Sequence, residues 1–208
     1  MYERTKIQAA CRQERLSNQD RRQETRNALI KAARALFLEK GYAATGTPEV
    51  VERAGLTRGA LYHHFKDKQA LFLAVAEAEA AQIAAEIEAG SAGAQTPLAA
   101  LNDGAQAFFT AMSEPGRVRL MLLEGPAVLS PETMRRIDLD TGGRELRLGI
   151  AEALGDGATA ERVNTLADLI SAMFDRAALA SAGGSDARLY QETVRALLAA
   201  LVAPQKGD

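Results

Sequence analysis

The 208-residue chain is predicted to be all-α, with a small N-terminal domain of three helices joined by a long helix to a larger helical domain. Alanine and leucine, which favour helices, are abundant, whereas aromatic residues make up only 5% of the chain and runs of β-branched residues are absent. Apolar residues also recur at helical spacing within most segments. We therefore divide the chain into residues 1–24, 25–72 and 73–208.

Residues 1–24 are polar and carry six basic side chains. A segment of this kind is expected to be a solvated, partly disordered leader, or in part a helical extension. The alternative is a basic arm that touches the backbone or minor groove of DNA, as in other small helical DNA-binding proteins. Arg21 and Arg22 are the expected contacts in that case, because they lie closest to the folded domain.

The first helix is predicted over residues 25–40, where Leu29, Ala33, Leu36 and Phe37 form a buried stripe. Gly41 is expected to end it. Tyr42 should then pack as a wedge against the two short helices of residues 47–65.

Residues 47–65 predict two short helices joined by a tight turn. Thr47 is expected to cap the first helix, Pro48 suits its first position, and Glu49 complements the helix dipole. Gly55 most easily adopts the left-handed conformation that ends a helix. Thr57 is then expected to cap the second helix. This arrangement is the helix-turn-helix, whose second helix enters the major groove of DNA.

The second helix should turn Leu61 and Phe65 inward and leave an outer face for DNA. An arginine in a first helical turn can reach a guanine edge or a phosphate, and a tyrosine hydroxyl can bind a phosphate. Free N–H groups at the two helix N-termini also favour phosphate. The expected DNA contacts are Thr47, Thr57, Arg58, Tyr62, His63, His64 and Lys68, with Arg21 and Arg22.

The segment from Arg26 to Val75 resembles the DNA-binding domain of the TetR (tetracycline-repressor-like) family of bacterial transcriptional regulators. The matching runs are LIKAARALFLEKGYAAT, VVERAGLTRGALYHHF and KDKQALFLAV. The resemblance implies DNA contact at or near Gly59 as well. It further implies a homodimer that binds a palindromic double-stranded operator, and a C-terminal domain that dimerises and binds an effector of unknown identity. No cofactor is implied.

A long helix is predicted from Lys68 to about Ala89, with the domain boundary near residue 72. Five further helical stretches follow it. Gly125-Pro126 should interrupt one of them, and Thr141-Gly142-Gly143 another. Ser185 is expected to cap the last helix, and Gly183-Gly184 should make the last two helices antiparallel neighbours. The stretches are residues 97–113, 118–129, 131–154, 160–182 and 185–202.

An effector pocket is expected between the second half of the long helix, near Ile83 and Ile87, and large, soft side chains of the later helices. These side chains suit an ordinary core equally well. Glu124 lies in an apolar stretch and needs a partner, either Arg119, Arg117 or a cationic effector. The charged pair Asp175-Arg176 also lies in an apolar stretch and needs a partner. The alternative to an effector there is an ion pair at a dimer interface. The candidate effector-binding residues are Phe109, Met121, Glu124, Met134 and Phe174.

The charge distribution fits nucleic-acid binding at one end of the chain. Residues 1–70 hold 14 Lys and Arg against 8 Asp and Glu, whereas residues 71–208 hold 11 against 19. Random variation would also give such an imbalance. The single cysteine, Cys11, excludes an internal disulfide framework, and neither an active-site constellation nor a metal site is visible. The sequence therefore predicts a cytoplasmic DNA-binding regulator without enzymatic activity, membrane span or cofactor. The alternative is a protein of the same fold controlled by a protein partner or acting architecturally.

Overall fold

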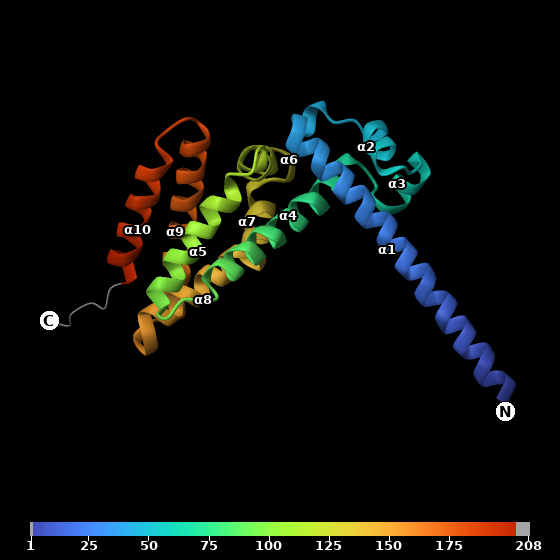
Figure 1. Cartoon of the computed structure of the whole chain (residues 1–208), viewed down its shortest axis with the longest axis horizontal. Coiled ribbons are helices and arrows are strands. Elements are labelled where there is room, and N and C mark those ends of the chain that lie inside the picture. The colour runs from blue at the N-terminus through green and yellow to red at the C-terminus, as the bar shows by residue number, and fades with distance from the viewer. Residues whose placement is uncertain (1, 203–208) are drawn as a thin grey trace. The chain divides into compact units, whose positions relative to one another are not determined.

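The computed structural model describes the backbone of residues 2–202 and the side chains of residues 17–155 and 157–202. Helices make up all the regular secondary structure of this described part, which confirms the predicted fold class (Figure 1). The chain forms two compact units, Met1–Val75 and Ala76–Asp208. The helices are α1 (Tyr2–Ala44), α2 (Thr47–Ala54), α3 (Arg58–His64), α4 (Lys68–Ser91), α5 (Pro97–Met112), η1 (Arg119–Glu124), α6 (Gly125–Leu129), α7 (Pro131–Asp140), α8 (Gly142–Leu154), η2 (Gly155–Gly157), α9 (Ala160–Ala182) and α10 (Ala187–Val202).

Helix α1 begins much earlier than predicted, at Tyr2 instead of residue 25. Residues 2–24 contain neither proline nor glycine, so nothing in this polar segment interrupts a helix that starts upstream. The predicted end is confirmed, because Gly41 has φ 86° and ψ 168° and breaks the helical backbone. Contact of this segment with DNA stays a prediction.

The core of the N-terminal unit is built around three aromatic rings. The ring centroids of Phe37 and Phe72 lie 5.2 Å apart, and those of Tyr42 and Phe72 lie 5.0 Å apart. Tyr42 thus packs against rings of α1 and α4, and its predicted packing against the helix-turn-helix stays a prediction. Aliphatic side chains of α1 to α4 are buried in the same unit, among them Leu29, Leu36, Val50, Val51, Leu61, Leu71 and Val75.

The core of the C-terminal unit lies between α5, α8, α9 and α10. Helices α9 and α10 pack against each other as antiparallel neighbours, as predicted (Figure 1). Ser185, however, is not the cap of α10. The Asp186 carboxylate instead accepts the backbone N–H groups of Arg188 and Leu189, at 3.0 and 3.3 Å. A carboxylate at that position also complements the helix dipole.

The two predicted interruptions take different forms. Helix α7 ends at Asp140 and α8 begins at Gly142, as expected from the glycines there. At Gly125-Pro126 the chain stays helical, with Gly125 at φ −52° and ψ −59°, but a π-helix precedes it. Proline lacks the N–H for the usual hydrogen bond and crowds the preceding turn, and the wider π turn relieves that crowding.

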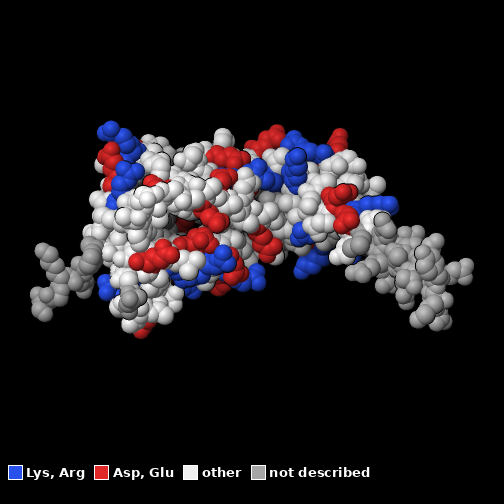
Figure 2. Space-filling model, turned by 60° about the horizontal axis from the view of Figure 1, so that its bottom comes forward, with Lys and Arg blue, Asp and Glu red and all other residues white. Residues whose placement is uncertain are grey.

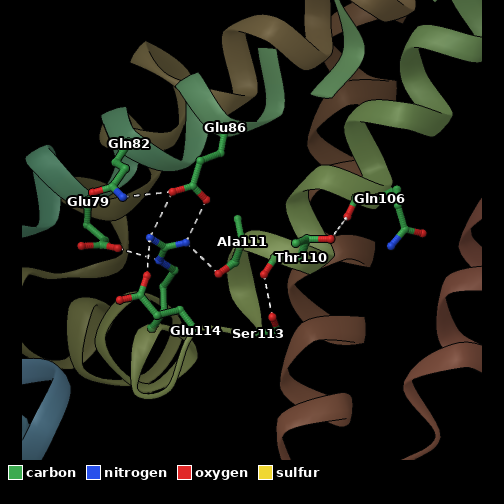
Figure 3. A network of polar contacts seen from close by, with 9 residues as sticks. Glu79, Gln82, Glu86, Gln106, Thr110, Ala111, Ser113 and Glu114 are labelled. Atoms are coloured by element: carbon green, nitrogen blue, oxygen red, sulfur yellow. Dashed lines mark hydrogen bonds and ion pairs between the residues drawn. The ribbon is translucent and has the colours of Figure 1, made fainter. Parts of the chain in front are cut away.

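One fully buried arginine connects α4 to the segment between α5 and η1 (Figure 3). The side chain of Arg117 is 1% exposed and binds Glu79, which is 0% exposed, at 2.6 Å. It also binds Glu86 at 3.1 Å and Glu114 at 2.7 Å, and donates to the Ala111 carbonyl at 2.7 Å. This network fixes α4 to the C-terminal unit.

Candidate DNA-binding surface and ligand cavity

The turn between α2 and α3 has the geometry that the sequence predicts for a helix-turn-helix. Gly55 adopts the left-handed conformation, with φ 65° and ψ 31°, and ends α2. The Thr57 hydroxyl accepts the N–H of Ala60 at 3.2 Å and so caps α3. Burial of Leu61 and Phe65 then fixes which face of α3 is exposed.

The exposed face of α3 carries most of the predicted DNA contacts. Arg58, Gly59 and His63 are exposed, and the side chain of Tyr62 is 55% exposed. His64 is half-buried. Burial lowers the pKa of its imidazole, and His63, Arg22 and Arg26 lower it further by repulsion. The lowered pKa favours the neutral imidazole of His64, in which one ring nitrogen can accept a hydrogen bond.

Thr47 is not the cap of α2. The cap is Gly46, whose N–H is accepted by the Glu49 carboxylate at 3.0 Å. Glu49 also pairs with Lys40 at 2.6 Å. Because Glu49 reaches back over the first turn, the helix begins one residue earlier than the hydroxyl of Thr47 would require. Thr47 occupies the first helical position and is half-buried.

Lys68 has a structural role that the sequence did not reveal. Its ammonium donates to the carbonyls of Tyr42 and Thr45, at 2.7 and 2.9 Å, and lies 4.0 Å from the centroid of the Tyr42 ring. It thereby satisfies carbonyls left open where α1 ends. Arg21 and Arg22 lie exposed on α1.

The C-terminal unit contains a cavity of about 1000 Å³, with walls from α4 to α9. Of the predicted effector residues, Met121, Met134 and Phe174 line it, and Ile83 and Ile87 do so from α4. Phe108 lines it too. A cavity of this size falls within the range of small-molecule sites.

Phe109 and Glu124 do not line the cavity. Phe109 belongs to the hydrophobic core, because neighbouring residues on a helix point about 100° apart and Phe108 takes the inner position. Glu124 faces Arg119 at 3.8 Å, one of the two arginines considered for it. The other, Arg117, binds the carboxylates described above.

Two acidic groups of the cavity come from different helices, and sequence reasoning singled out Asp175 as a carboxylate in need of a partner but did not connect Asp138 with it. Asp138 of α7 accepts a hydrogen bond from the Ser171 hydroxyl at 3.3 Å, and burial raises its pKa. Burial, reinforced by the nearby Asp138, raises the pKa of Asp175 to about 7. Arg176 is exposed, unlike its neighbour. The apolar residues around Asp175 in the sequence were the only signal that its side chain faces inward.

Within the described side chains, no group of three or more His, Cys, Asp or Glu is arranged to hold a metal ion. None of the helices described is both long and apolar enough to cross a membrane.

A helix-turn-helix with an exposed second helix, joined through α4 to a helical domain with a cavity, defines a DNA-binding transcriptional regulator. Residues 29–75 match the model for bacterial regulatory proteins of the TetR family. Residues 98–204 match the tetracycline-repressor-like C-terminal domain. The chain belongs to the TetR family.

Individual relatives agree with this assignment. The chain is 27% identical to the transcriptional activator FasR of Mycolicibacterium smegmatis, over 61% of its own length and 58% of FasR. It is 40% identical to the transcriptional repressor AcnR of Corynebacterium efficiens, over 31% of its length and 35% of AcnR. The chain thus matches no more than about three-fifths of these curated relatives, and both are transcriptional regulators.

Solved structures show the same fold over most of the chain. A TetR-family regulator from Pectobacterium atrosepticum is 32% identical, with a TM-score of 0.67, and the match covers 88% of this chain and 94% of that one. RolR in complex with resorcinol is 20% identical, with a TM-score of 0.70 over 89% and 91% of the two chains.

Proposed function

We propose that this protein is a homodimeric repressor that binds a palindromic operator and is released from it by a small molecule bound in the cavity. The observation that carries the proposal is the course of α4. This helix begins at Lys68 in the N-terminal unit and continues to Ser91, and its second half supplies Ile83 and Ile87 to the cavity wall. A ligand that displaces α4 therefore acts on the helix that leads to the DNA-binding unit.

DNA contact is proposed for the exposed face of α3, with Arg58, Tyr62 and His63 as the central residues. Thr57 and Gly59 lie at the N-terminal end of α3, where free N–H groups favour phosphate. Thr47, His64, Arg21 and Arg22 complete the proposed set. Lys68 is proposed to act indirectly, because its ammonium already binds two carbonyls.

Dimerisation is proposed through α9 and α10. Leu189, Leu197 and Leu201 of α10 are 60%, 45% and 39% exposed, and Leu169 of α9 is 61% exposed. The three leucines of α10 recur at helical spacing and form an apolar stripe. Two such helix pairs can form a four-helix bundle around a two-fold axis, which buries the stripe.

Ligand release requires that the effector binds two arrangements of the dimer with different affinity. A two-fold dimer holds its recognition helices about 34–36 Å apart to reach successive major grooves. A tilt of α4 would change that spacing. RolR, which has the same fold, binds resorcinol in its crystal structure, and this supports a ligand-binding role for the architecture.

The proposal is tested in two stages with the full-length protein. Operator sequences are first selected from a random DNA pool, and binding is measured by fluorescence anisotropy at fixed salt. Spin labels at Lys66→Cys, an exposed site directly after α3 and outside the proposed contacts, in a Cys11→Ser background, then report the distance between the two α3 helices in the dimer. We expect a ligand that releases DNA to shift or broaden that distance. An unchanged distance upon release would refute the α4 mechanism.

The direction of regulation is tested with a reporter gene placed behind the selected operator. Repression follows if the dimer blocks polymerase, and expression should rise on adding the ligand. Lower expression upon deletion of the regulator would instead identify it as an activator. Both directions occur among its relatives, since AcnR is a repressor and FasR an activator.

A further inference from the structure

The charged side chains that line the cavity in the C-terminal unit are predominantly acidic. Seven carboxylates and two guanidinium groups line it, the latter belonging to Arg135 and Arg147. Both guanidinium groups are engaged, Arg135 by Asp168 at 3.1 Å and Arg147 by the carbonyl of Leu139 at 2.7 Å. Both arginines partly offset the charge of Asp138, but neither acts on Asp175. Acidic side chains also surround a hollow on the face of this unit shown in Figure 2.

Two of these carboxylates come from different helices but lie close enough to repel each other. Asp138 projects from α7 and has only the Ser171 hydroxyl as a hydrogen-bond donor, at 3.3 Å. Asp175 projects from α9 and has no hydrogen bond or ion pair with any described residue. The charged group that acts on Asp175 is Asp138, which repels it. A half-buried carboxylate without a hydrogen-bond donor is costly in its charged form unless a cation or donor approaches it.

The rest of the cavity wall would not suit a small, strongly hydrated cation. Phe108, Met121, Met134 and Phe174 give it large, polarisable surfaces, and Ile83 and Ile87 extend these along α4. Aromatic rings attract cations, and methionine adapts to ligands of varied shape. The space and the chemistry together fit an organic molecule with a bulky apolar body.

We propose that the cavity binds lipophilic organic monocations, with the positive charge held between Asp138 and Asp175 and the apolar body against the Phe and Met side chains. This inference rests on the proposed function only in taking the cavity as the effector site. A cation there neutralises a repulsive pair of carboxylates. A lipophilic anion of the same shape would place its charge beside acidic groups and gain no counter-charge.

Tetraphenylphosphonium and tetraphenylborate form a suitable pair of probes, because they share shape and apolar surface and differ in the sign of charge. Binding to the full-length protein is measured by isothermal titration calorimetry without DNA, together with a benzalkonium cation and the neutral phenol resorcinol. We expect the two cations to bind at least about tenfold more tightly than tetraphenylborate and resorcinol. Equal or tighter binding of the anion or the phenol, or binding of neither cation, would overturn the proposal.

Asp175→Asn and Asp138→Asn remove each charge with little change of volume. Each should weaken phosphonium binding by about tenfold or more, since truncating one side of a buried charge pair is expensive. Asp103→Asn, at an exposed site on α5 outside the cavity, is the matched control and should leave binding unchanged. Melting curves confirm that each variant is folded. Cation affinity that is unaltered in both cavity variants would refute the assignment.

The outcomes also separate this inference from the proposed function. If the cations bind through Asp138 and Asp175 but leave operator affinity unchanged, the cavity assignment stands and release by this ligand class is wrong. If a neutral or anionic compound releases the operator equally well from wild type and Asp175→Asn, the repressor mechanism stands and the cationic assignment is wrong.

Discussion

Arg117 and Glu79 form a buried ion pair, with Nε and Oε1 2.6 Å apart and both side chains almost wholly removed from solvent. The pair joins α4 to the segment that follows α5. Its partners lie 38 positions apart in the sequence. Removal of either charge leaves the other buried and partly uncompensated.

Arg117→Ala should therefore destabilise the protein by about 3–5 kcal/mol, the range for breaking a buried pair from one side. Arg135→Ala is the matched control, because the Arg135–Asp168 pair, at 3.1 Å, is also an arginine–carboxylate pair but is 66% and 61% exposed. That change should cost no more than about 1 kcal/mol. Urea unfolding measures both, and equal losses would contradict the role assigned to Arg117.

Arg58→Ala and Tyr62→Phe should weaken operator binding without unfolding the protein, because both side chains lie on the exposed face of α3. Loss of a base contact would cost about 1–3 kcal/mol, whereas loss of a phosphate contact would weaken all DNA sequences alike. Anisotropy titrations at fixed salt separate the two cases. Arg144→Ala, an exposed arginine in the C-terminal unit, should leave operator affinity unchanged. Unaltered affinity in both α3 variants would refute the assignment of α3.

Leu197→Glu should give monomers or aggregates, because a charge would enter the proposed interface on α10. Leu166 is a less direct probe, since it packs partly against the hydrophobic core and its replacement by Glu would also disturb folding. Leu123→Glu is the control, as Leu123 is 55% exposed but lies on η1. Light scattering should find this control dimeric. A dimeric Leu197→Glu variant would place the interface elsewhere.

Asp175→Asn should stabilise the ligand-free protein at alkaline pH. The pKa of Asp175 rises from 3.8 to about 7 on folding, so the folded state holds its proton over that range while the unfolded chain has released it. Stability contributed by this proton is complete below pH 4 and is lost as pH rises through about 7. The variant should gain on the order of 2–4 kcal/mol over wild type at pH 8, from about 1.4 kcal/mol per pKa unit. At pH 4 the free energy of unfolding of the variant should differ little from that of wild type.

Denaturant unfolding at the two pH values checks this, with Asp103→Asn as the control that removes an exposed charge. A constant difference between wild type and Asp175→Asn across the range would show that Asp175 titrates normally.

Local signals in the sequence predicted most helix boundaries. The ends of α9 at residues 160 and 182 follow from Thr159, which caps it at 3.2 Å, and from the glycines after it. The start of α1 could not be predicted in this way, because residues 2–24 are largely polar and lack a signal that marks a helix end. At α2 and α10 the start is fixed by a neighbouring acid, Glu49 or Asp186, instead of the hydroxyl residue that the pattern favoured.

The cavity was harder to predict because its chemistry depends on which side of each helix faces inward. Phe108 and Phe109 are adjacent, and only the packing of α5 decides which of them lines the cavity. Glu124 would share a face with Met121 in a regular α-helix, where residues three apart are neighbours. The π turn of η1 separates them. Asp138 and Asp175 meet only through the tertiary fold, so neither sequence segment reveals the pair.

The π-helix η1 has a consequence for how this regulator can diversify. Such a turn contains one more residue than the α-helical turn it replaces, with hydrogen bonds from i to i+5. Deletion of one residue within Arg119–Glu124 would restore a regular helix and rotate Arg117 by about 100° relative to Pro126. The arginine would then leave its carboxylates while Pro126 stayed at the cavity. One residue in this turn thus sets how Arg117, which anchors α4, is oriented relative to Pro126 in the cavity wall.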